Sequence, residues 1–334
     1  MCAKKKGEAE MMLVWNILLL VAGFVLLIKG ADFFVVGASR IAQRFGIPEI
    51  VIGLTIVAFG TSAPEAAISI SAAVQGNTGI AIGNILGSNI LNILIILGVT
   101  ACIANLPVAK TTAKYEMPFV IFISVVLLLL AATAGELSTF AGIVLWVLFI
   151  AFFIYLIVIS KKGGNKEISD VDERAIKEVR KKGGAKAVLV AIVMTLGGLA
   201  AVVIGSNLAI DGATYIAKFF GMSDRLIGLT IVALGTSLPE LVTSITAARK
   251  DNTDIAIGNI VGSNIFNILF VLGTTALIAP VPFESKFIVD GVVCIASAVM
   301  LFLFVLNKDR KLKRSGGIVM LLSYAAYFVY LLVS

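Results

Sequence analysis

The sequence contains no histidine and only three cysteines, Cys2, Cys102 and Cys294. Histidine is the commonest transition-metal ligand, so its absence excludes most zinc, copper and haem sites. The cysteines are scattered and odd in number, which predicts neither a disulfide framework nor a Cys-x-x-Cys metal site. No P-loop segment is present to hold nucleotide phosphates. With no nucleophile–base pair in sight either, we expect no enzymatic activity and no cofactor.

Charge is also scarce. Charged residues make up 14% of the 334 residues, hydrophobic residues make up 59%, and the mean hydropathy is +1.05. This composition lies outside the range of soluble domains. Apolar runs recur that are long enough to cross a hydrocarbon core of about 30 Å as helices. The alternating strands of a membrane barrel are absent from the sequence pattern. We therefore expect an all-α polytopic membrane protein whose surroundings are the lipid bilayer.

The chain contains an internal repeat. Residues 46–104 align with residues 221–279 at a constant offset of 175, and 38 of the 59 positions are identical. A shared helical composition would not preserve Asn and Ser at matching positions, so the pattern indicates a tandem duplication. We expect a first five-helix repeat at 1–159, a linker at 160–186 and a second repeat at 187–334.

Ten membrane-spanning helices follow from the apolar runs. They are expected at about 13–29 (with an extension to residue 44), 49–75, 79–104, 116–133, 138–159, 187–218, 224–249, 254–279, 286–306 and 316–333. Five spans per copy is an odd number, so the copies lie antiparallel, as in the inverted repeats of secondary transporters. The basic start followed by an apolar run is similar to a signal peptide. Because the first span has a counterpart deep in the chain, we expect it to be retained as a mature helix.

The basic residues predict the orientation. Of the 27 Lys and Arg residues, 21 fall in connections on the side of the linker. The positive-inside rule then places the linker in the cytoplasm and both termini outside, in the inner or plasma membrane of the cell. The net charge of +7 therefore indicates topology and contact with anionic lipid, and not nucleic-acid binding. No obligatory protein partner is implied.

Each copy carries the motif Gly-Thr-Ser-x-Pro-Glu within an apolar run. Pro64 and Pro239 remove a backbone donor, and proline is tolerated at the first position of a helix. The motif therefore predicts that helices 2 and 7 are broken at Gly-Thr-Ser and restart at proline. Glu65 and Glu240 then fall in the first turn of the restarted half, where the helix dipole favours a negative charge. The break also leaves carbonyl oxygens without helical hydrogen bonds. Within the membrane, such oxygens occur only where they are buried in protein or line a hydrated cavity.

The two glutamates predict a cation site. A carboxylate at this depth costs at least about 2.5–3.5 kcal/mol, and a bound cation offsets that cost. Further oxygen groups recur at i, i+4 and i+8 in helices 3 and 8, on the face expected to lie against the broken helix of the same copy: Asn84, Ser88, Asn92, Asn259, Ser263 and Asn267. Such oxygens suit calcium or sodium. Taken singly, these polar residues are also typical of ordinary interhelical hydrogen bonds. The Gly-x-x-x-Gly patterns beside them are typical of close helix packing.

The segments "GTSAPE" with "GNILGSNILN", and "GTSLPE" with "GNIVGSNIFN", resemble the two alpha-repeats of the sodium/calcium exchanger family. The resemblance implies an antiporter that exchanges sodium for calcium by alternating access, with helices 1 and 6 sliding over the site. It implies these roles: a calcium site from Glu65, Glu240 and the carbonyls of Thr61 and Thr236; sodium sites from Ser62, Ser88, Ser237, Ser263 and the carbonyls of Ala58 and Ala233; and Asn92 and Asn267 at the centre.

The sequence departs from the family pattern in two respects. Some members carry an acidic residue where this chain has Asn92 or Asn267, so this site has two carboxylates and potassium co-transport is not expected. The linker of 27 residues leaves no room for a large calcium-sensing domain, which resembles a prokaryotic member. Two alternatives stay open: a proton/calcium antiporter of the same superfamily, in which the carboxylates carry protons, and a passive cation channel. The hydroxyl and carbonyl oxygens favour sodium, and the closed glutamate pair favours exchange over a channel.

Overall fold

The computed structural model describes residues 2–74, 78–163, 185–221 and 233–333. Eight helices in these segments are long and apolar enough to cross a membrane, and the bent pair Glu49–Thr61 and Ala63–Val74 adds a ninth span. The remaining expected span, the seventh at 224–249, lies partly outside the described residues. The prediction of a polytopic helical membrane protein is confirmed.

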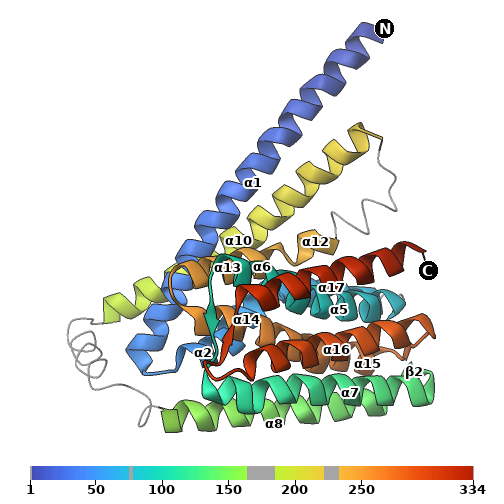
Figure 1. The fold of residues 1–334 in the computed structure, drawn as a ribbon. Helices are drawn as coiled ribbons and strands as arrows, with labels where there is room; N and C mark the ends of the chain where they lie inside the picture. Colours follow the sequence, from blue (N-terminus) through green and yellow to red (C-terminus); the bar gives the residue numbers. More distant parts are fainter. Residues whose placement is uncertain (1, 75–77, 164–184, 222–232, 334) are drawn as a thin grey trace.

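The elements follow the duplication (Figure 1). The first repeat contains α1 (Cys2–Phe45), α2 (Glu49–Ile52), the π-turn η1 (Gly53–Val57), α3 (Ala58–Thr61), α4 (Ala63–Val74), α5 (Thr78–Leu91), η2 (Asn92–Leu97), α6 (Gly98–Ile103), β1 (Leu106–Pro107), η3 (Thr112–Glu116), α7 (Met117–Ala134), β2 (Glu136–Leu137) and α8 (Thr139–Gly163). The second contains α10 (Ala185–Phe219), α12 (Ala233–Thr236), α13 (Leu238–Arg249), α14 (Thr253–Phe266), η5 (Asn267–Leu272), α15 (Gly273–Ile278), β3 (Val281–Pro282), α16 (Lys286–Val305), β4 (Lys311–Leu312) and α17 (Arg314–Val333).

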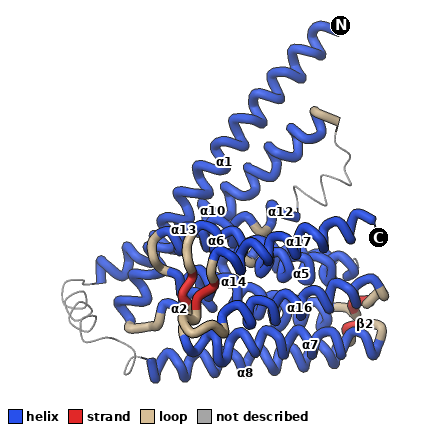
Figure 2. The backbone as a smooth tube through the Cα atoms, in the orientation of Figure 1, coloured by secondary structure: helices blue, strands red, loops and turns tan. Residues whose placement is uncertain are grey.

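Four two-residue strands show that the repeats are inverted (Figure 2). By the offset of 175, β1 corresponds to β3 and β2 corresponds to β4. The strands pair as β1 with β4 and β2 with β3, each pair antiparallel. The connection that follows the third span and contains β1 thus lies beside the connection that precedes the tenth span and contains β4. It does not lie beside β3, its counterpart in the other repeat. Equivalent connections therefore lie at opposite ends of the bundle, as two antiparallel copies of five spans require.

Helices α1 and α10 form a long pair that crosses the remaining helices steeply (Figure 1). The first span is one continuous helix through residue 45, so the expected extension beyond residue 29 is confirmed. The contact between the pair is lined by glycines seven residues apart: Gly23, Gly30 and Gly37 on α1, and Gly198, Gly205 and Gly212 on α10. A Cβ built on any of these would lie 2.4–2.8 Å from an atom of the opposite helix. Only glycine permits backbones to approach this closely.

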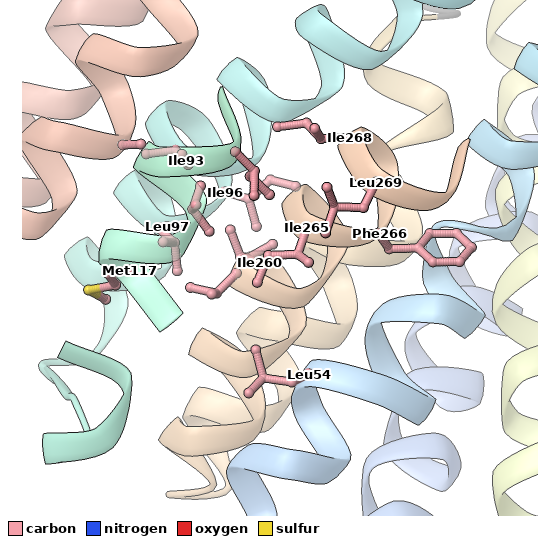
Figure 3. Close-up of a cluster of buried hydrophobic side chains, with 14 of the residues drawn as sticks. Leu54, Ile93, Ile96, Leu97, Met117, Ile260, Ile265, Phe266, Ile268 and Leu269 are labelled. Atoms are coloured by element: carbon pink, nitrogen blue, oxygen red, sulfur yellow. The ribbon is translucent and has the colours of Figure 1, made fainter. Parts of the chain in front are cut away.

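The core surrounds the span Thr253–Ile278, which begins with α14 and whose most apolar stretch is 94% buried. Figure 3 shows Leu54 of η1, Ile260 of α14 and Ile96 of η2 within one apolar cluster, together with Leu269 of η5. Gly258 and Gly262 let α14 approach the first half of the broken helix, since a Cβ there would lie 3.0 and 2.7 Å from the Cα atoms of Gly53 and Leu54. The close-packing interpretation is thus confirmed for this Gly-x-x-x-Gly pattern.

Two polar contacts join α1 to the turn between α13 and α14. Lys250 Nζ lies 3.2 Å from Asp32 Oδ1, and Asn252 Nδ2 donates to Ser39 Oγ at 2.8 Å. From the sequence alone, Asp32 would be placed at a helix end in contact with solvent. Because α1 continues well past it, Asp32 lies inside the helix and is paired, although its side chain remains 39% exposed.

The glycine contact predicts opposite results at two neighbouring positions. In Gly198→Ala the new Cβ would lie 2.4 Å from Phe34 N, whereas at Gly197 no described atom lies within 4 Å. Alanine favours a helix over glycine by about 1 kcal/mol, but overpacking costs about 1–3 kcal/mol. We expect Gly198→Ala to lower the melting temperature in detergent and Gly197→Ala to leave it unchanged or raise it. Equal melting temperatures for the two variants would contradict the close contact.

Candidate functional site: a buried oxygen-lined centre

The second span is broken at the predicted motif. The halves Glu49–Thr61 and Ala63–Val74 are bent by 49°, with Ser62 at φ −82° and ψ 7°. The seventh span has the same local form, because Ser237 at φ −92° and ψ 5° separates α12 from α13. Proline is the second residue of each restarted half, within the first turn and one position later than expected.

The break leaves carbonyl oxygens without their usual helical donors. Pro64 and Pro239 have no N–H to offer Gly60 and Gly235 four residues earlier. In the second repeat, Ser206 Oγ of α10 donates to Gly235 O at 2.9 Å. The long helix pair therefore touches the backbone of the broken helix directly.

Glu65 and Glu240 lie in the first turns of α4 and α13 and are 1% and 0% exposed. Ser62 Oγ, from the opposite repeat, donates to Glu240 Oε1 at 2.8 Å. The two carboxylates lie near enough to interact electrostatically. Two buried negative charges that interact in this way require a compensating positive charge.

Helices α5 and α14 each contact the broken helix of their own copy, as expected. Asn84 Nδ2 donates to Ser69 Oγ at 2.9 Å in the first repeat. Asn259 Nδ2 donates to Ser244 Oγ at 2.9 Å in the second. These equivalent bonds attach each restarted half to the helix that follows it in the chain.

Contacts across the two copies were not expected. Thr61 Oγ1 donates to Asn259 Oδ1 at 3.0 Å, and Ser263 Oγ donates to Ala58 O at 3.5 Å. The expectation that these faces meet only their own broken helix is therefore incomplete. In the second span the first half packs against α14 of the other repeat, whereas the restarted halves α4 and α13 pack against α5 and α14 of their own repeat and also contact the other repeat.

Asn92 and Asn267 are the first residues of the π-turns η2 and η5. π-turns frequently occur at functional sites. Turn η2 packs against α13, which carries Glu240, and η5 packs against α4, which carries Glu65. Each central asparagine therefore lies on a turn that contacts the glutamate-bearing helix of the other repeat.

Every predicted site residue whose side chain is described is buried. The buried members are Ala58, Thr61, Ser62, Glu65, Ser88, Asn92, Thr236, Ser237, Glu240, Ser263 and Asn267. The backbone of Ala233 begins α12, and its side chain lies outside the described residues. Sequence reasoning missed Asn89 and Asn264, which bond across the repeats. Their signal was present, because the Gly-Ser-Asn triplet is identical in both copies.

Besides Ser237 Oγ, four oxygens of this region have no hydrogen-bond partner among the described residues: Glu65 Oε2, Glu240 Oε2, Asn92 Oδ1 and Asn267 Oδ1. Buried polar atoms are normally paired, so each unpaired one calls for an explanation. All four are hard oxygen acceptors in two matched pairs, the chemistry that suits sodium or calcium. Within the described segments, no three His, Cys, Asp or Glu side chains are grouped to hold a metal ion. The candidate cation ligands are therefore two carboxylates plus neutral oxygens.

These features define a membrane protein of two inverted helical repeats whose broken helices meet at a buried, oxygen-lined centre. The chain belongs to the sodium/calcium exchanger protein family, which matches residues 15–158 and 190–333. The expected resemblance is confirmed over both copies.

The chain is similar to curated and solved members of this family. It is 42% identical over 331 residues to the putative antiporter CaxA of Alkalimonas amylolytica, covering 97% of this chain and 100% of the relative. It is 35% identical over 351 residues to the sodium/calcium exchanger MaX1 of Methanosarcina acetivorans, covering 96% and 99%. A solved structure of the sodium-calcium exchanger NCX_Mj, soaked with 10 mM Na+ and zero Ca2+, superimposes with a TM-score of 0.81 at 34% identity, covering 95% and 99%.

The buried carboxylates predict the effect of neutralising them. Removing one partner from a buried charge cluster costs about 3–5 kcal/mol, which corresponds to about 100-fold or more in affinity. We expect Glu65→Gln and Glu240→Gln each to weaken calcium-45 binding to the purified protein by that factor while the melting temperature is retained.

Glu116→Gln is the matched control. Glu116 is also buried, at 2% exposed, and it accepts a hydrogen bond from Tyr155 OH in another part of the bundle. We expect this variant to bind calcium like the wild type. Unchanged calcium binding in Glu65→Gln or Glu240→Gln would overturn the assigned site.

Proposed function

We propose that this protein is a secondary active antiporter that exchanges sodium for calcium by alternating access. The observation that carries the proposal is the set of unpaired oxygens on Glu65, Glu240, Asn92 and Asn267, buried where the two repeats meet. Two carboxylates neutralise one calcium ion, or two sodium ions in neighbouring positions. Ions that cannot be held together must replace one another, and the result is exchange.

The neutral oxygens support sodium as the coupling ion. Ser62, Ser88, Ser237 and Ser263 supply hydroxyls, and Ala58, Thr61, Ala233 and Thr236 supply backbone carbonyls, as ligands that coordinate sodium without changing protonation. The names of MaX1 and NCX_Mj as sodium/calcium exchangers support the same assignment. No resident cofactor is needed, because the ions are the cargo.

We further propose that α1 and α10 move over the site to open it alternately to the two sides. Two observations support this proposal: Ser206 donates a hydrogen bond to Gly235 O at one break, and the side chains of Phe34 and Leu199 lie beside Gly60 at the other. The glycine contact keeps the two helices close together during this movement.

The proposed orientation has the linker 160–186 in the cytoplasm and both termini outside, in the inner or plasma membrane. The pairing of β1 with β4 supports it by bringing two basic connections to one end, and Val108 N donates to Arg310 O at 2.8 Å there. We also propose the division into repeats at 1–159 and 187–334.

The coupling ion can be tested by calcium-45 uptake into proteoliposomes under three conditions: sodium inside only, a proton gradient only, and no gradient. We expect uptake only with internal sodium, and none in Glu65→Gln vesicles. Uptake driven by protons alone would replace sodium by protons as the coupling ion. Equal uptake in all three would indicate a passive cation channel and overturn the exchange mechanism.

The same assay predicts the effect of acid. A proton competes with a cation for a carboxylate oxygen, so ion affinity falls when the ligand is protonated. We expect sodium-driven uptake to decrease steadily when both sides are brought from neutral to mildly acid pH. More calcium at acid pH should restore the rate. A rate that is flat across this range would show that carboxylates do not bind the ion.

A further inference from the structure

Four asparagines form a reciprocal set of hydrogen bonds between α5–η2 and α14–η5. Asn89 Nδ2 donates to Asn264 O at 3.3 Å, and Asn264 Nδ2 donates to Asn89 O at 3.2 Å. Asn92 Nδ2 donates to Asn264 Oδ1, and Asn267 Nδ2 donates to Asn89 Oδ1, both at 3.1 Å. All four residues are buried. Every bond of this asparagine cluster joins one repeat to the other.

The bonds determine which way each amide faces. An asparagine amide has an oxygen that accepts and an NH2 group that donates, and the two can exchange places by rotation. A backbone carbonyl can only accept. Because Asn264 Nδ2 bonds the carbonyl of Asn89, its Oδ1 must point toward Asn92 and accept from it. Asn92 Nδ2 is thereby engaged, and its Oδ1 is left without a described partner.

The same chain of reasoning applies on the other side. Asn89 Nδ2 bonds the carbonyl of Asn264, so Asn89 Oδ1 accepts from Asn267, and Asn267 Oδ1 is the unpaired atom. A rotated Asn92 or Asn267 would present NH2 hydrogens to a cation, which repels them. The amide orientation therefore decides whether these two residues are ligands or obstacles.

We propose that Asn89 and Asn264 are positioning residues that orient the side-chain oxygens of Asn267 and Asn92 toward the transported cation. The inference rests on the proposed function, since it concerns the same ion site. It adds that each repeat orients a ligand of the other, so neither copy holds a complete site alone. Removal of a residue that hydrogen-bonds and orients a metal ligand typically lowers metal affinity by about 10–100-fold.

An aspartate at position 92 distinguishes a role of Asn264 in orienting the ligand from a role in helix packing alone. The side chain introduced by Asn92→Asp has two equivalent oxygens and presents one to the cation whichever way it turns. We expect Asn264→Ala to weaken calcium-45 binding about 10–100-fold. In the Asn92→Asp background, we expect the same Asn264→Ala change to alter binding by less than about threefold. A packing defect would weaken binding equally in both backgrounds, and that result would overturn the proposal.

Controls distinguish the possible failures. Ile90 is next to Asn89 and fully buried. Ile90→Ala therefore loosens packing without removing an amide hydrogen bond, and we expect it to lower the melting temperature while calcium affinity is unchanged. If Asn264→Ala fails to fold, the mirrored pair Asn89→Ala and Asn267→Asp gives the same comparison. If Glu65→Gln abolishes calcium binding but Asn264→Ala does not weaken it, the positioning role is wrong and the ion site stands. If Glu65→Gln binds normally, the ion site itself is wrong.

Discussion

Two carboxylates buried at the same interface impose the main constraint on this structure. A buried negative charge is costly unless hydrogen bonds and an opposite charge compensate it, and a second one nearby doubles the demand. The local fold supplies compensation at several levels. The broken helices place Glu65 and Glu240 at helix N-termini, where the dipole favours them. Ser62 donates to Glu240 from the opposite repeat. The remaining unpaired oxygens lie nearby, which makes the centre a place that a cation stabilises.

Much of the fold was predictable because the duplication carries geometric information. Five spans per copy predict inversion, and the pairing of β1 with β4 confirms it. The Gly-Thr-Ser-x-Pro-Glu motif predicts the break at Ser62 and Ser237 because proline cannot donate within a helix. A polar residue inside an apolar run is visible in any sequence, so nearly all of the candidate site could be named before its geometry was known.

The partners of these residues could not be predicted from the sequence. The offset of 175 shows which residues are equivalent, but it does not show which copy each one touches. Thr61 bonds Asn259 and Ser62 bonds Glu240 because the first half of the broken helix packs on the opposite copy. The repeated Gly-Ser-Asn triplet marks Asn89, but its partners could not be predicted for the same reason, since they belong to the opposite copy. The sequence likewise does not show that Asp32 pairs with Lys250 in the turn between α13 and α14.

The glycine contact between α1 and α10 has a mechanical consequence. Side chains that interlock between helices must be withdrawn from one another before either helix can shift along its axis. Where Gly23, Gly37 and Gly205 bring backbone against backbone, few side chains interlock between the two helices. Separation of the two helices would lose this extensive contact, whereas a small axial shift would exchange one smooth surface for a similar one. The contact therefore resists separation of α1 from α10 more strongly than it resists a shift of one helix along the axis of the other.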